Sequence, residues 1–229
     1  MGEPLGTVIV TGGSSGLGAA VTSAVNDGGG TSVVLDVQTR SRGVEHRVVD
    51  LSDGRATEAA VAEIAEQHPD LAAVVCAAGI DACGSLADVG PTAWERVVAV
   101  NLLGTAAVIR AALPALLRNH GRVVTVASTL GVRALPDATA YCASKFGVVG
   151  FTRALAAETA GRLGVTLLIP GGMHTAFFDG RPDQYRPGPD ARLNQPDNVA
   201  AAVLFALRQP PGCEIRELVV CPETETSWP

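Results

Sequence analysis

The sequence has 229 residues, a length that fits one α/β domain with a substantial hydrophobic core. Its net charge of −6, without any cluster of basic residues, argues against a nucleic-acid partner. Charged residues make up 17% of the chain, below the usual proportion of about a quarter. We therefore expect part of the surface to be covered by another subunit.

The sequence has no evident targeting signal or metal-binding motif. It enters a predicted core strand within a few residues of Met1, so we expect no signal peptide and a cytoplasmic location. No apolar run comes near the roughly 20 residues of a membrane-spanning helix, and we expect no membrane partner. The five cysteines have neither CxxC nor Cys/His spacing, which predicts reduced thiols and no metal site.

The first predicted strand, Leu5–Thr11, runs directly into the glycine-rich segment TGGSSGLG. Glycines let the chain turn sharply and let a pyrophosphate approach the backbone, and the N–H groups of the following helix (19–25) favour that anion. A plain tight turn is the alternative, but the strand–turn–helix order predicts a dinucleotide site. Its predicted binding residues are Gly12, Ser14, Ser15, Gly16, Leu17 and Gly18.

Asp36 ends the second predicted strand (31–35), 24 residues after Gly12. A carboxylate at this point can accept hydrogen bonds from an adenosine ribose, and it repels a 2′-phosphate. We therefore predict NAD rather than NADP as cofactor. An exposed loop aspartate is the alternative, and Arg40 or Arg42 would weaken the inference by folding back over Asp36.

Two more strands and two helices are expected over the next seventy residues. A third strand (46–49) ends at Asp50, and Asp53 is the predicted N-cap of a helix over 55–67. A fourth strand (71–76) is followed by small residues that leave room for a ligand. A long helix is predicted over 91–118 with Asn101 in its apolar middle, which implies a buried bonding role or a local distortion.

The stretch from Arg122 to Gly150 carries the predicted chemistry. A buried strand (122–127) ends at Ser128, and a helix entered at Pro136–Asp137 presents Tyr141 and Lys145 on one face, about 6 Å apart at Cβ. Lys145 is the only lysine among 17 basic residues. An ammonium beside a phenol lowers the phenol's pKa, which suits proton transfer. Because this lysine stands alone in the chain and Ser128 lies upstream, an ordinary surface Tyr/Lys pair is the weaker interpretation.

The remaining chain completes the predicted fold. A sixth strand (165–169) is followed by the loop 174–196, rich in Pro, Gly, Asp and Arg, which we expect to be a mobile lid. Asp197 is the predicted cap of a helix over 199–208, and a last strand covers 215–221 before a polar tail. Seven strands alternating with helices predict one domain, 1–229, with a doubly wound parallel sheet.

With these motifs the chain resembles the short-chain dehydrogenase/reductase family over nearly its whole length. The matching elements are TGGSSGLG, Asp50, Asn101, Ser128, YCASK (141–145) and PGGMHT (170–175). The resemblance implies a Rossmann-type fold, a nicotinamide cofactor and a homotetramer or homodimer. In the family's NNAG turn, however, Cys76 replaces the first Asn, and the usual Gly-rich C-terminal ending is missing.

The resemblance also implies residue roles. Tyr141 would be the general acid or base, Ser128 would bind the substrate oxygen, Lys145 would bind the nicotinamide ribose, and Asn101 would hold a proton-relaying water. Catalytic residues are thus Asn101, Ser128, Tyr141 and Lys145. Tyr141 and Lys145 also count as cofactor contacts, together with further residues that the family motifs place around the nicotinamide and adenine. These are Asp50, Leu51, Ala78, Gly79, Pro170, Gly171 and Thr175.

The predicted activity is NAD(P)-dependent interconversion of a secondary alcohol and a ketone by hydride transfer. Within this class, a 3-oxoacyl-thioester or polyketide ketoreductase using NADPH is the alternative to a dehydrogenase of a small alcohol, sugar or steroid. A catalytically silent NAD-binding sensor or scaffold would not need Ser, Tyr, Lys and Asn in register. A dehydratase or epimerase usually has a longer C-terminal segment. The sequence does not identify the substrate.

Overall fold

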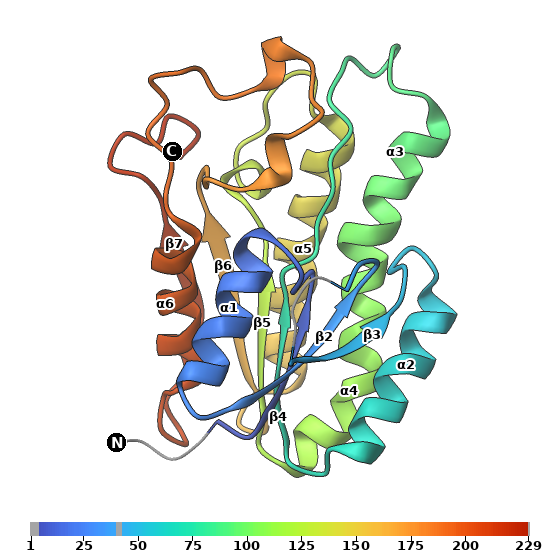
Figure 1. Ribbon diagram of the computed structural model, residues 1–229, viewed down its shortest axis with the longest axis vertical. Coiled ribbons are helices and arrows are strands. Elements are labelled where there is room, and N and C mark those ends of the chain that lie inside the picture. The colour runs from blue at the N-terminus through green and yellow to red at the C-terminus, as the bar shows by residue number, and fades with distance from the viewer. Residues whose placement is uncertain (1–4, 40–42, 229) are drawn as a thin grey trace.

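Seven parallel strands form one sheet in the computed structural model, which describes residues 5–39 and 43–228. The sheet order is β3-β2-β1-β4-β5-β6-β7, which confirms the predicted doubly wound α/β fold (Figure 1). The strand bounds agree with the predicted ones to within two residues. They are β1 (Thr7–Thr11), β2 (Thr31–Asp36), β3 (Glu45–Val48), β4 (Leu71–Cys76), β5 (Arg122–Val126), β6 (Gly164–Pro170) and β7 (Glu217–Val220).

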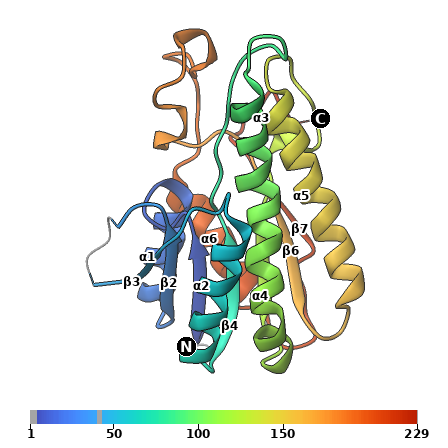
Figure 2. The same cartoon turned by 90° about the vertical axis from the view of Figure 1, so that its right-hand side faces the viewer.

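Helices cover both faces of the sheet (Figures 1 and 2). Helices α1 (Gly16–Asp27) and α6 (Pro196–Leu207) pack on one face, and α2 (Gly54–Gln67), α4 (Thr105–Arg118) and α5 (Thr139–Glu158) pack on the other. Along β1, Val8 and Val10 belong to the core under α1 and α6, whereas Ile9 belongs to the opposite core. Because both faces are buried, the inner strands β1, β4, β5 and β6 are mostly apolar rather than alternating.

The sheet order reverses between β1 and β4. Strand β1 pairs with β2 on one side and with β4 on the other, so the chain crosses to the other half of the sheet after β3. In open α/β sheets a ligand crevice forms at this point, beyond the carboxyl ends of the strands. The loop after β4, the segment 174–196 and the C-terminal segment gather at this edge, at the top of Figure 1.

The predicted helix over 91–118 is interrupted. It consists of α3 (Pro91–Val98), a π-helical segment η1 (Ala99–Gly104) and α4. A Cβ on Gly104 would lie 2.7 Å from the carbonyl oxygen of Leu51, so only glycine fits at that contact. The π-helical segment carries Asn101, which is 1% exposed. The sequence-based expectation of a buried or distorted position at Asn101 is therefore confirmed on both counts.

Two other local expectations are wrong. The first is that no apolar run comes near the length of a membrane-spanning helix, because Pro91–Arg118 is long and apolar enough by length and composition alone. Half of its most apolar window is buried, and core helices pass the same test. Asp197 does not cap α6. The helix begins at Pro196, one residue before Asp197, and Gln195 is its N-cap. Proline is pre-organised for the first helical position.

Candidate active site

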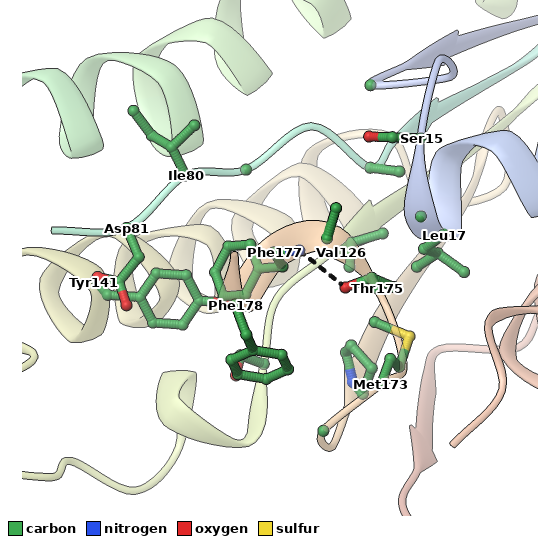
Figure 3. Close-up of a pocket in the computed structure, with 18 of the residues that line it drawn as sticks. Ser15, Leu17, Ile80, Asp81, Val126, Tyr141, Met173, Thr175, Phe177 and Phe178 are labelled. Atoms are coloured by element: carbon green, nitrogen blue, oxygen red, sulfur yellow. Dashed lines mark hydrogen bonds between the residues drawn. The ribbon is translucent and has the colours of Figure 1, made fainter. Parts of the chain in front are cut away.

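The crevice at the carboxyl ends of the strands holds a cavity of about 1410 Å³. Pockets for one small ligand usually measure roughly 300–1,000 Å³, so this cavity has room for a dinucleotide and a substrate together. In Figure 3, Ser15 and Leu17 lie at one end of the cavity and Asp81 and Tyr141 at the other. Every predicted site residue except Asn101 lines it. They are Gly12, Ser14, Ser15, Gly16, Leu17, Gly18, Asp36, Asp50, Leu51, Ala78, Gly79, Ser128, Tyr141, Lys145, Pro170, Gly171 and Thr175.

The glycine-rich turn is a cradle that side chains would fill. Gly12 has a φ of +69°, and a Cβ there would lie 2.8 Å from the Cα of Ala78. A Cβ on Gly18 would lie 2.2 Å from the carbonyl oxygen of Gly12. Ser15, at the N-cap position of α1, makes no side-chain hydrogen bond to the first turn. No side chain at the N-cap therefore occupies that turn's N–H groups, and such groups at a helix N-terminus suit an anionic pyrophosphate.

Asp36 connects the end of β2 to this turn. Its Oδ2 accepts a hydrogen bond from the backbone N–H of Ser14 (3.1 Å), and its Oδ1 accepts one from the backbone N–H of Gln38 (3.1 Å). The carboxylate is thus fixed at the cavity edge, where the sequence predicted a ribose contact. Arg40 and Arg42, which would modify this prediction, lie outside the residues that the structure describes.

Asp50 is held in the same way at the end of the next strand. Its Oδ1 accepts from the backbone N–H (2.9 Å) and hydroxyl (2.8 Å) of Ser52, and its Oδ2 pairs with the Arg96 guanidinium at 2.9 Å. The hydrogen bond from the Ser52 backbone, with smaller contributions from Arg96, lowers the pKa of this carboxyl. Arg96 comes from α3 and lines the cavity, and no local pattern pointed to it.

Tyr141 and Lys145 project from α5 into the other end of the cavity. Lys145 is 4% exposed, its Nζ donates to the carbonyl oxygen of Val126 at 2.8 Å, and this atom lies 5.6 Å from the centre of the Tyr141 ring. Burial lowers the pKa of Lys145 to about 8.

The expectation that Lys145 lowers the pKa of Tyr141 is wrong for this structure. Burial raises the pKa of Tyr141 well above its ordinary value, and hydrogen bonding with Ser128 opposes that change only in part. The sequence showed the partner cation but not the depth of burial. Ser128 itself lies two residues after β5, at the N-cap of the turn η2 (Thr129–Gly131), where its Oγ accepts from the Leu130 N–H at 3.1 Å.

Asn101 lies behind the cavity and links its parts. Its Oδ1 accepts from the backbone N–H of Ile80 (2.8 Å), and its Nδ2 donates to the Ile80 carbonyl (2.9 Å) and to Ser144 Oγ (3.0 Å). Ser144 in turn donates to the carbonyl oxygen of Tyr141 at 2.8 Å. Asn101 therefore joins the loop after β4 to the helix that carries Tyr141, which is a positioning role.

The turn after β4 is still tied to the neighbouring strand, although Cys76 stands where the family usually has Asn. Thr11 Oγ1 accepts from the backbone N–H of Ala78 at 3.0 Å and ties the turn to β1. A Cβ on Gly79 would lie 3.5 Å from Lys145 Nζ, so the backbone passes close to the lysine. Burial raises the pKa of the Cys76 thiol to about 12, so it is a neutral core group beneath the site.

The segment 174–196 lies over the site and contacts it at several points, whereas its expected mobility stays a prediction. Arg181 forms an ion pair with Asp81 (3.0 Å), and both side chains are largely buried. In the short helix η3 (Ala176–Phe178), the Phe177 ring lies 5.6 Å from that of Tyr141 (Figure 3). Tyr185, in η4 (Asp183–Tyr185), donates to Asp137 at 3.2 Å. His174 does not line the main cavity.

The C-terminal segment also enters the site, although the sequence predicted only a polar tail. Glu225 Oε2 accepts from the backbone N–H of Gly172 at 3.0 Å, and its Oε1 accepts from the N–H (2.9 Å) and hydroxyl (2.7 Å) of Ser227. Ser227 Oγ also lies 2.6 Å from Thr129 Oγ1, within hydrogen-bond distance of that hydroxyl and next to Ser128. Among the described residues, no group of three or more His, Cys, Asp or Glu side chains is placed to hold a metal.

The fold and these motifs agree with comparisons to known proteins. The family model "short chain dehydrogenase" matches residues 6–186. 2-(S)-Hydroxypropyl-CoM dehydrogenase 3 of Xanthobacter autotrophicus is 31% identical over 227 residues, which cover 87% of this chain and 88% of that protein. 2-Dehydro-3-deoxy-L-rhamnonate dehydrogenase (NAD(+)) of a Sphingomonas species is 34% identical over 214 residues, 86% of each chain.

A solved structure shows the same arrangement. The putative NAD(P)-dependent gluconate 5-dehydrogenase of Beutenbergia cavernae, with NADP bound at low occupancy, is 30% identical. It matches with a TM-score of 0.83, covering 96% of this chain and 98% of that one. Because the family model spans most of the sequence and relatives above 30% identity align along nearly the full length, this chain belongs to the short-chain dehydrogenase/reductase family of NAD(P)-binding oxidoreductases.

Proposed function

We propose that this protein interconverts a secondary alcohol and a ketone with a nicotinamide cofactor, Tyr141 being the general acid or base. The observation that carries the proposal is that Ser128, Tyr141 and Lys145 meet in the same cavity as the glycine cradle and Asp36. A cradle for a pyrophosphate and a proton-transfer group in one enclosed space suit hydride transfer coupled to proton transfer.

The residues present fit the cofactor. The Gly12–Gly18 turn and the first turn of α1 would hold the pyrophosphate, Asp36 the adenosine ribose, and Asp50 and Leu51 the adenine. Lys145 would bind the nicotinamide ribose, and Thr175, whose side chain lies beside Gly16, would bind the carboxamide. When bound, the nicotinamide supplies or accepts the hydride.

The chain's own residues handle the proton. Tyr141 Oη gives a proton to the carbonyl oxygen in reduction and takes it from the hydroxyl in oxidation, while the Ser128 hydroxyl hydrogen-bonds that oxygen. Burial favours the neutral phenol, which is the form needed for reduction. Asn101 holds the Tyr141 helix in place, and we retain as a proposal its role in carrying the proton onward through a water.

We infer NAD as the preferred cofactor, because a carboxylate fixed at the end of β2 repels a 2′-phosphate. Among the relatives, one is named for NAD(+) and one carries NADP, so similarity alone does not decide. Titration with NADH and NADPH, followed by nicotinamide fluorescence, tests the inference. Tighter binding of NADPH would overturn it and favour the alternative, a ketoreductase of thioester-linked substrates. Binding of neither would contradict the proposed function, and binding without turnover of any alcohol or ketone would favour the silent NAD-binding scaffold.

A screen of alcohols and ketones with the bound cofactor tests the activity itself. The proposal expects turnover of at least one member and loss of that turnover in Tyr141→Phe. Light scattering tests the further proposal of a homodimer or homotetramer, which a monomeric mass would contradict.

A further inference from the structure

The substrate end of the cavity contains a buried ion pair beside the catalytic tyrosine. Arg181 and Asp81, 100 residues apart, meet at 3.0 Å with side chains that are only 15% and 8% exposed. Asp81 is further held by the backbone N–H of Ala82 (2.7 Å) and by the Cys83 thiol (3.2 Å). Neither Asp81 nor its pairing could be inferred from a local motif, and both residues line the cavity.

The pair is connected to Tyr141 through aromatic rings. The Arg181 guanidinium lies 4.5 Å from the centre of the Phe177 ring and 4.8 Å from that of Phe178. The Phe177 ring lies 5.6 Å from that of Tyr141, and Figure 3 shows Asp81 and Phe177 next to Tyr141. Asp81 raises the pKa of Tyr141 and Arg181 lowers it, so the two charges act on the phenol in opposite directions.

Another arginine of the same segment behaves differently. Arg186 pairs with Asp183 at 3.1 Å, but its side chain is 48% exposed and that of Asp183 is 96% exposed. Water screens such an exposed pair, whereas a buried charge without its partner is strongly unfavourable. Of these two arginines, the one stacked on Phe177 beside Tyr141 is thus the one that a buried carboxylate already neutralises.

We propose that the Asp81–Arg181 pair selects substrates that are uncharged next to the reacting carbon. A carboxylate entering there meets the Asp81 carboxylate, which repels it and already occupies the Arg181 guanidinium. An ester, amide, hydroxyl or alkyl group meets a neutral pair and aromatic walls. This inference depends on the proposed function, since it concerns the substrate of the same reaction.

Similarity alone does not decide whether the substrate is charged. Two of the relatives are named for sugar acids, a rhamnonate derivative and gluconate, whereas another is named for the uncharged polyol D-threitol. The proposal therefore depends on the residues around Tyr141.

The test compares a neutral probe with an anionic one, an ethyl ester with its free acid. Ethyl acetoacetate and acetoacetate are reduced with NADH by the full-length protein, by Asp81→Asn and by the matched control Asp183→Asn. We expect the unchanged protein to favour the ester by about tenfold or more in kcat/KM, as expected when an unfavourable charge contact is made only by the acid. Asp81→Asn leaves Arg181 unpaired and should lower the ratio of kcat/KM for the ester to kcat/KM for the acid by at least tenfold. Asp183→Asn should leave it unchanged.

A double variant separates charge from general disruption of the segment. Asp81→Asn/Arg181→Met has neither charge and should keep the preference for the ester. If it shifts towards the acid like Asp81→Asn alone, the effect is a loosened segment and the inference is wrong. The inference is equally wrong if the unchanged protein prefers acetoacetate.

A binding readout distinguishes failure of this inference from failure of the proposed function. Isobutyramide and isobutyrate are titrated into the protein saturated with NADH, and nicotinamide fluorescence reports their binding without turnover. Absence of NADH binding contradicts the proposed function. Binding of NADH with isobutyrate favoured over isobutyramide contradicts the inference alone, while a preference for isobutyramide that Asp81→Asn reverses supports it.

Discussion

The two ends of the cavity are built in different ways. At the cofactor end, the turn 11–18, Asp36 and Asp50 lie at the ends of neighbouring strands, and both carboxylates accept hydrogen bonds from backbone N–H groups. At the substrate end, the walls are side chains from three segments far apart in the chain, joined by the pairs Asp81–Arg181 and Ser227–Thr129. The cofactor end depends on backbone geometry, and the substrate end depends on which distant side chains the fold brings together.

The largest effect expected from this comparison is on Tyr141, which belongs to the substrate end. Tyr141→Phe should lower kcat by about 10²-fold or more, the usual contribution of a general acid–base group. NADH affinity should change little, because the cradle is untouched. Tyr185→Phe removes the other tyrosine hydroxyl, which bonds Asp137, and serves as the control. Equal losses in the two variants would contradict the assignment.

The cofactor end is tested by Asp36→Asn. A charge-assisted hydrogen bond is worth about 1.5–3 kcal/mol, so NADH affinity should fall by about tenfold or more. NADPH affinity, the internal control, should hold or improve because the repulsion of its 2′-phosphate is removed. Parallel losses of both cofactors in fluorescence titrations would mean that Asp36 only supports the turn through Ser14.

The C-terminal segment offers a smaller and more selective test. Glu225→Ala removes acceptors for Gly172 and Ser227, each hydrogen bond contributing about 1 kcal/mol, and frees a wall of the substrate end. We expect a several-fold increase in substrate KM with little change in NADH affinity. Glu223→Ala, an exposed carboxylate of the same segment, is the control. A change in NADH affinity as large as the change in KM would place the segment at the cofactor end.

The smallest effect is a pH dependence of stability. Burial lowers the pKa of Lys145 from 10.5 to about 8, so the unfolded chain binds more protons than the folded one between these values. The contribution of Lys145 to the free energy of unfolding should therefore rise with pH across that window. Denaturant unfolding of the unchanged protein and of Lys145→Met from pH 7.5 to 10 measures this difference. A flat difference would show that Lys145 is not buried as described.

Most of the architecture was predictable from local patterns. Continuous apolar runs indicate strands buried on both faces, and each predicted strand overlaps an observed one. The alternation with helices determines parallel pairing, and right-handed crossovers place Gly12, Asp36, Ser128 and Gly171 at one edge. Functional residues at strand ends can be predicted from the sequence, because the place of a strand in the sheet determines where its last residue lies.

Tertiary structure alone decided the rest. Asp81, Arg96, Arg181 and Glu225 act through partners that no spacing reveals, since their contacts span 46 to 100 residues. The pKa of Tyr141 depends on how deeply α5 is buried, and the neighbouring lysine does not show that depth. The sequence by itself therefore determined the fold and pointed to the residues that we propose for cofactor binding and proton transfer. Only the tertiary structure decided which side chains close the substrate end and which charges lie there. These side chains come from separate loops, and contacts between distant loops leave no regular spacing in the sequence.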